Sequence, residues 1–154
     1  MNGFNFLKKS ENTILTKTKN CVDRSGITKG NIMTEEDKRS NELEQTMANC
    51  YGTENYYTDQ HLDFKYTDGV KTFCETAMAY WLLDLVNSVV KTKPAMNEDL
   101  IVITLTVKDN HKATITFEDS ENIIYKQIIP FTDCPKGKWL FYYENNVFFW
   151  NGEY

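Results

Sequence analysis

The sequence is poor in the side chains from which metal and redox sites are built. Its 154 residues include only two histidines and four cysteines. These six residues are His61, His111, Cys21, Cys50, Cys74 and Cys134. No two cysteines form a Cys-x-x-Cys pair, whereas a structural zinc site needs four such ligands at close spacing. We therefore expect no metal, no cofactor, and cysteines that remain free thiols.

Long apolar runs and an excess of basic residues are also missing. No stretch is apolar enough over about 20 residues to span a bilayer. Residues 1–10 lack the apolar core of a secretory signal, so we expect a cytoplasmic protein without membrane contact. The net charge of −5 argues against nucleic-acid binding, which needs a basic face. Mimicry of a nucleic acid needs a continuous acidic stripe, and residues 118–121 offer only a short run.

Recognised arrangements of catalytic residues are absent as well. Gly52 and Gly69 stand alone, and no glycine-rich phosphate loop occurs. The sequence shows no Ser-His or Cys-His arrangement that would activate a nucleophile. We therefore name no catalytic residue and favour a protein without enzymatic activity.

A long apolar segment, residues 67–90, is the most informative part of the chain. Thr67 or Asp68 can cap its start. Spacings of three and four residues connect Val70, Phe73, Cys74, Ala77, Trp81, Leu85 and Ser88. Burying each large side chain contributes roughly 1.5–3 kcal/mol, so several neighbours must cover this segment. The pattern predicts one long central helix.

The period of the apolar residues changes to two after Lys93-Pro94, which predicts a break. Alternation predicts strands over residues 101–107, 113–117, 123–131, 139–143 and 147–150. Short turns between them favour an antiparallel meander. Before the long helix, a capping box of Thr34 and Asp37 predicts a helix over residues 35–48, with Leu43 and Met47 on its apolar stripe.

These elements predict an α+β fold, in which N-terminal helices precede one long central helix packed on an antiparallel meander sheet of about five strands. Residues 34–154 form the single domain of this prediction. Residues 1–33 are polar, without a clear period, and we interpret them as an extension.

Acids and tyrosines gather near the predicted start of the long helix. Four of them are candidates for a small-ligand or catalytic cluster: Glu54, Tyr57, Asp68 and Asp84. A structural alternative stays open, in which Asp68 caps the helix, Lys71 pairs with Glu75, and the other side chains brace the preceding loop. A lone buried carboxylate costs several kcal/mol, so Asp84 must be paired or lie at a wet edge of the helix. We expect solvated imidazoles at both histidines.

The last predicted hairpin carries more aromatic rings than one covered face requires. Four of them are candidates for a binding surface: Trp139, Tyr142, Phe148 and Trp150. A sheet covered on one side usually shows polar residues on the other, and a large exposed apolar patch marks an interface. Either residues 1–33 cover this second face, or it contacts a protein partner, which is a second copy of the chain or a host protein.

Several motifs resemble the signature of an uncharacterised family of small bacterial and phage proteins. They are Tyr51–Tyr57 (YGTENYY), Tyr66–Lys71 (YTDGVK), Ala79–Asp84 (AYWLLD), Phe131–Pro135 (FTDCP) and the closing Glu153-Tyr154. The likeness covers residues 41–154. It implies a cytoplasmic protein, often from a mobile element, and it implies no reaction.

Two functions follow from these patterns. The first is a non-enzymatic, protein-binding accessory protein of a phage or mobile element, for example an inhibitor of a host defence system. The alternative is a small enzyme or ligand binder that uses the acid and tyrosine cluster near residue 68.

Overall fold

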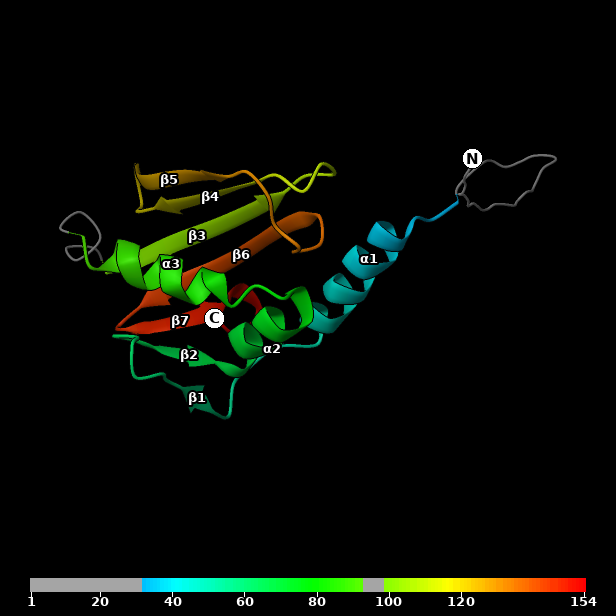
Figure 1. Ribbon diagram of the computed structural model, residues 1–154. Coiled ribbons are helices and arrows are strands. Elements are labelled where there is room, and N and C mark those ends of the chain that lie inside the picture. Colours follow the sequence, from blue (N-terminus) through cyan, green and yellow to red (C-terminus); the bar gives the residue numbers. More distant parts are fainter. Residues whose placement is uncertain (1–31, 93–98) are drawn as a thin grey trace. The chain divides into compact units, whose positions relative to one another are not determined.

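A seven-stranded sheet with two helices on one face forms the centre of the fold (Figure 1). The computed structural model describes residues 32–92 and 99–154. The predicted break at Lys93-Pro94 and all but the last two residues of the predicted 1–33 extension therefore lie outside the described residues. Residues Glu35–Tyr154 form one compact unit. The predicted α+β class is confirmed.

In its described residues, this unit contains four helical elements and seven strands. The helices are α1 (Glu35–Ala48), α2 (Asp68–Ala77) and α3 (Trp81–Val90), and a short 3-10 helix, η2, covers Asn151–Glu153. The strands are β1 (Tyr56–Tyr57), β2 (Lys65–Thr67), β3 (Leu100–Val107), β4 (Ala113–Glu118), β5 (Ile123–Ile129), β6 (Gly137–Glu144) and β7 (Val147–Trp150). Their order across the sheet is β1-β2-β7-β6-β3-β4-β5.

Strands β3 to β7 are the five that the alternation predicts, but they do not form a meander. β6 pairs with β3 over its whole length instead of with the preceding strand β5. This pairing sets the buried Phe141 opposite the buried Ile103 and continues the apolar face beneath the helices. The strand order therefore follows the burial of the largest apolar side chains and departs from chain order.

Two further strands, β1 and β2, were not predicted, because they are only two and three residues long and show no measurable period. β2 runs parallel to β7, with Tyr66 opposite Phe148, and β1 pairs antiparallel with β2. The sheet is therefore mixed. β2 also leads directly into α2 and so fixes where that helix begins.

The predicted long helix is wrong in one respect, because the segment forms two helices that turn at Met78. This residue has φ 54° and ψ 48°, which is the left-handed conformation that ends many helices. In a straight helix, Leu82 would lie about 140° around the axis from Ala77. The turn lets both residues be fully buried and lets α2 and α3 cover the same sheet face (Figure 1). No helix in the described part of the chain is long and apolar enough to cross a membrane.

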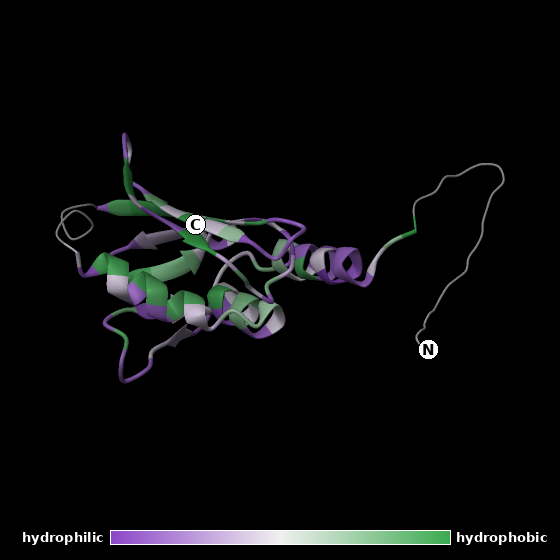
Figure 2. Cartoon of the chain, turned by 45° about the horizontal axis from the view of Figure 1, so that its top comes forward, coloured by the Kyte–Doolittle hydropathy of each residue, from purple (hydrophilic) through white to green (hydrophobic). Residues whose placement is uncertain are grey.

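Helix α1 has the predicted bounds and is mostly hydrophilic (Figure 2). Its predicted apolar stripe is confirmed, since Leu43 and Met47 are almost completely buried. Ser40 is buried beside them and donates a hydrogen bond of 2.6 Å to the carbonyl oxygen of Lys136. One face of α1, over about two turns, thus attaches the helix to the rest of the unit.

Substitutions at Met78 test the break between α2 and α3. A left-handed conformation costs a non-glycine residue about 1–2 kcal/mol, and glycine avoids this cost. We expect Met78→Gly to be about 1 kcal/mol more stable than Met78→Ala in urea unfolding, because both variants lose the same exposed side chain and only alanine keeps the strain. Equal stability of the two variants would contradict the assigned backbone conformation.

Candidate functional site

The carboxylate of Asp68, at the first residue of α2, gathers the loop that precedes β1. One of its oxygens, Oδ2, accepts hydrogen bonds from Thr53 Oγ1 (3.1 Å) and from the backbone N–H groups of Glu54 (2.8 Å) and Asn55 (3.0 Å). The other, Oδ1, accepts from the Tyr57 hydroxyl (2.7 Å) and the Asn55 side chain (3.3 Å). Thr53 Oγ1 in turn accepts from the Asp68 N–H at 3.0 Å. Both carboxylate oxygens are therefore engaged by the protein itself.

These contacts change the acidity of both partners. The Tyr57 hydroxyl, followed by the backbone N–H groups, holds the pKa of Asp68 well below its usual range. The same hydrogen bond raises the pKa of Tyr57. An acid that stays ionised and fully hydrogen-bonded is a poor proton acceptor for a substrate. The geometry therefore favours a structural role, in which Asp68 and Tyr57 fasten the preceding loop to the helix. The predicted side-chain cap is wrong, because the N-cap residue Thr67 makes no capping hydrogen bond and the Asp68 carboxylate bonds the loop instead of the first turn.

The four residues of the predicted cluster do not converge. Glu54 contributes its backbone N–H, and only Tyr57 joins Asp68 through its side chain. Asp84 lies on the exposed side of α3, where its Oδ1 is 2.9 Å from Nε2 of His61. Both side chains of that pair are about two-thirds exposed, so Asp84 occupies the wet edge of the helix.

Two other predictions about charged side chains can be compared with the structure. Lys71 pairs with Glu75 at 2.7 Å on the surface of α2, as predicted. His111 was expected to be solvated, and this is only partly so: its side chain is 39% exposed, but its ring packs against Phe131 with centroids 5.2 Å apart, and its Nδ1 lies 3.8 Å from Glu36 on α1. The long-range packing of α1 against this turn causes the difference.

Glu153 provides a second anchor for α2 that the sequence did not reveal. Its carboxylate accepts hydrogen bonds from the Thr67 hydroxyl (2.5 Å), the Gly69 N–H (2.9 Å) and the Trp150 N–H (3.0 Å). A negative group at this position also complements the positive end of the helix dipole. The helix is thus capped by an acid 84 residues further along the chain, and local capping motifs cannot predict such a partner.

The aromatic residues of the last hairpin divide between the two sheet faces. Trp139 and Phe148 are buried under the helices, so these two candidates belong to the core and offer no surface to a partner. Trp150 is half-buried on the same face, where its ring contacts Phe141 at 5.5 Å. Tyr142 is the one candidate of the four on the opposite face, because it alternates with Phe141 along β6.

A cluster of three rings occupies that opposite face. Tyr142 lies across from Phe149 in the β6–β7 pair, with ring centroids 5.7 Å apart. Tyr154 packs on both, at 4.9 Å from Tyr142 and 5.6 Å from Phe149, and is stacked parallel to the latter. Tyr154 is 72% exposed and the other two are half-buried. We call Tyr142, Phe149 and Tyr154 the aromatic cluster.

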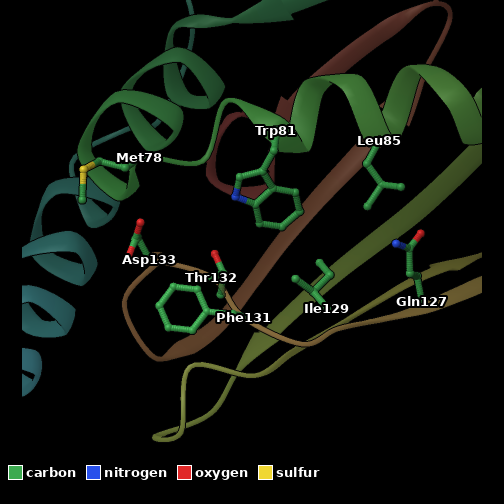
Figure 3. Close-up of a pocket in the computed structure, with 8 residues that line it drawn as sticks. All are labelled: Met78, Trp81, Leu85, Gln127, Ile129, Phe131, Thr132 and Asp133. Atoms are coloured by element: carbon green, nitrogen blue, oxygen red, sulfur yellow. The ribbon is translucent and has the colours of Figure 1, made fainter.

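A groove of about 360 Å³ lies between α3 and strand β5 (Figure 3). Met78, Trp81 and Leu85 line one side of it. Gln127, Ile129 and Phe131 line the other. The side chains of Trp81 and Ile129 point toward one another across it (Figure 3). The side chains that line the groove are mainly apolar, and β5, which forms one wall of it, is an edge strand of the sheet.

The described cysteines are free thiols, and two of them, Cys74 and Cys134, are buried. Burial raises the pKa of the Cys74 and Cys134 thiols to about 12, which makes them inert as nucleophiles. Cys50 is also free, and Cys21 lies outside the described residues. Within residues 32–92 and 99–154, no three His, Cys, Asp or Glu side chains gather closely enough to hold a metal ion.

The fold and the site define a small α+β protein whose helices cover one face of a mixed sheet and whose acids serve as structural anchors. The chain belongs to a family of unknown function, DUF6876, whose model matches residues 41–154. The match covers the residues for which the motifs predicted membership of an uncharacterised family. A comparison with curated proteins and a comparison with solved structures gave no match.

Asp68 predicts a specific pH dependence of stability. Its pKa is lower in the folded chain than in the unfolded chain, so its contribution is complete above the unfolded value of about 3.9 and is lost as the pH falls below it. We expect Asp68→Asn to lower stability at pH 7 and to flatten the decline of stability below pH ~4 in urea unfolding. Tyr57→Phe, which removes one donor, should flatten the decline partly. An unchanged decline in Asp68→Asn would contradict this role.

Gly69 provides a test of the Glu153 anchor. In an ordinary helix, Gly→Ala stabilises by about 1 kcal/mol. Here, a Cβ on Gly69 would lie 2.7 Å from Glu153 Oε2 and 2.9 Å from Trp150 Cβ, so the carboxylate must move away. We expect Gly69→Ala to destabilise the protein by about 1–3 kcal/mol in urea unfolding, because buried donors lose their acceptor. In the background Glu153→Ala, the part of this cost that comes from the displaced carboxylate should disappear, while the part that comes from the 2.9 Å approach to Trp150 Cβ remains.

Proposed function

We propose that this chain is a non-enzymatic protein-binding protein and that the aromatic cluster is its contact surface. The observation that carries the proposal is the stack of Tyr142, Phe149 and Tyr154 on the sheet face that α2 and α3 leave uncovered. Tyrosine and phenylalanine are enriched at the centres of protein interfaces. Rings that already pack on one another lose little conformational freedom on binding, which favours affinity.

The surroundings of the cluster support the same function. Leu140 and Val102 lie opposite Thr104 and Tyr142 in the β3–β6 pair and extend the apolar surface inward from the cluster. Tyr56, 58% exposed, lies on the same face at the β1 edge. A partner with an apolar or aromatic patch, rather than a strongly charged one, fits this surface.

The biological setting is the second part of the proposal. The motifs resemble those of phage and bacterial proteins, which supports an accessory role on a phage or mobile element inside the cytoplasm. A host protein is then the expected partner, and inhibition of a host defence system is one form of this role. The alternative, a small enzyme or ligand binder at Asp68, has less support because protein donors already occupy that carboxylate.

Binding measurements with matched variants test the contact surface. The chain would first be used to isolate a partner from host lysate, and the purified partner would then be titrated by calorimetry. Interface hot spots typically contribute 2 kcal/mol or more, so we expect Tyr142→Ala with Phe149→Ala to weaken binding at least about 30-fold. Tyr80→Ala, an exposed tyrosine between α2 and α3, should leave affinity unchanged. The reverse pattern would move the interface to the helix face.

A further inference from the structure

Strand β5 is one of the two edges of the sheet, and it is far longer than the other. β1 lies at the opposite edge (Figure 1). It has two residues, whereas β5 has seven. Among the described residues, β5 pairs only with β4. The side of β5 away from β4 therefore presents backbone N–H and C=O groups, which form a template for another strand.

The side chains at this edge are unusually apolar for a strand that faces water. Ile123 is 57% exposed, Ile128 is 67% exposed, and Phe131, just after the strand, is 62% exposed. Met78, 58% exposed, lies across the groove. The only charged residue in β5 is Lys126. Natural edge strands are usually protected by several charges, prolines or bulges, and the residues 125–129 contain none besides this lysine.

We infer that β5 is a self-association surface, on which β5 of a second copy of this chain pairs antiparallel about a two-fold axis through Gln127. The regularly paired part of β5 is residues 125–129, because the register shifts between Phe117 and Glu118, opposite the start of the strand. Gln127 is the centre of these five residues. An isologous contact of this kind closes after two copies, in contrast to an open fibre.

The charge of Lys126 favours this register over the register whose two-fold axis passes through residue 126. An axis through Lys126 would place two lysines directly opposite each other, which is destabilising. An axis through Gln127 instead places Lys126 opposite the partner's Ile128, and the aliphatic part of the lysine can cover that exposed side chain. It also places Ile129 opposite the partner's Tyr125, an aromatic and β-branched pair of the kind that stabilises sheets.

The groove supports a second copy as the occupant. In this register, the partner's Tyr125 lies beside Ile129, at the open side of the groove. Phe131 extends beyond the paired residues toward the start of the partner's β5, where Ile123 is exposed. The exposed apolar side chains of β5 are thus covered by side chains from β5 of the second copy. No other partner is needed. This association uses the sheet edge and is independent of the aromatic cluster.

Charge substitutions at Ile128 test both the dimer and its register. The dimer constant of the full chain would be measured by sedimentation equilibrium. Ile128→Glu puts a carboxylate opposite the partner's Lys126 at two symmetric positions, and we expect about fivefold tighter association. Ile128→Lys creates two like-charge pairs there, and we expect association weaker by a similar factor. The exposed position of Ile128 leaves the fold of both variants intact, which circular dichroism would check.

Each outcome of this experiment decides the inference. The inference is supported if Ile128→Glu and Ile128→Lys shift the dimer constant in opposite directions and if Tyr142→Ala and Phe149→Ala leave the dimer unaffected. A strictly monomeric chain at submillimolar concentration overturns it, as does a dimer that the two aromatic substitutions abolish, because the aromatic cluster would then be the self-contact. Equal effects of the two Ile128 variants overturn the Gln127 register. Failure here leaves the proposed partner binding untouched, since that is measured by titration with a different protein.

Cross-linking locates the axis independently. Residues directly opposite each other have Cβ atoms about 4.5–5.5 Å apart, and diagonal ones are about 7–8 Å apart. Under mild oxidation, we expect Gln127→Cys to form a 127–127 disulfide between copies, identified by peptide mass spectrometry. Lys126→Cys, one residue from the axis, should form at most a small fraction of that product. Efficient cross-linking of Lys126→Cys with little from Gln127→Cys would place the axis at residue 126.

Discussion

Two carboxylates at the start of α2 hold together segments that are distant in the sequence. Asp68 binds the loop that precedes β1, and Glu153 binds the helix from the last turn of the chain. The first turn of a helix has N–H groups without partners, and both acids lie where the helix dipole favours negative charge. The loop, the helix and η2 therefore form one hydrogen-bonded assembly. Glu153 is also the neighbour of Tyr154, so this assembly positions one ring of the aromatic cluster.

Much of the fold could be predicted because its elements carry strong local patterns. The strands β3 to β7, helix α1 and the buried face of α2 follow directly from spacing. The turn at Met78 could not, because the residue has no intrinsic preference for the left-handed conformation. It adopts that conformation so that two apolar faces reach one sheet. Likewise, the pairing of β6 with β3 depends on how the largest side chains are buried together, which local alternation does not specify.

The candidate site also contains some features that could be predicted from the sequence and others that could not. The Lys71–Glu75 pair joins residues one helical turn apart and was predicted. Bracing of the loop by Tyr57 was also predicted, whereas the helix cap expected at Asp68 is not formed, because its carboxylate bonds residues 53–57 instead. In the aromatic hairpin, side chains alternate between the two faces of the sheet, so the sequence places Trp139 and Tyr142 on opposite faces. The alternation does not show which of the two faces the helices cover. A prediction from the sequence alone therefore included residues of both faces. Glu153 was missed for a simpler reason, since its partners lie 84 and 86 residues away.

The separation between Glu153 and its partners also has a consequence for the way the chain folds. Contacts between residues far apart in the sequence form late, because closing the intervening loop costs entropy before any contact compensates it. The parallel β2–β7 pair has the same long range, with Tyr66 beside Phe148. The first half of the unit therefore gains β7, the partner strand of β2, and its helix cap only when the second half has assembled. Such a chain is expected to acquire its native structure in a single cooperative step rather than by docking a preformed helical half.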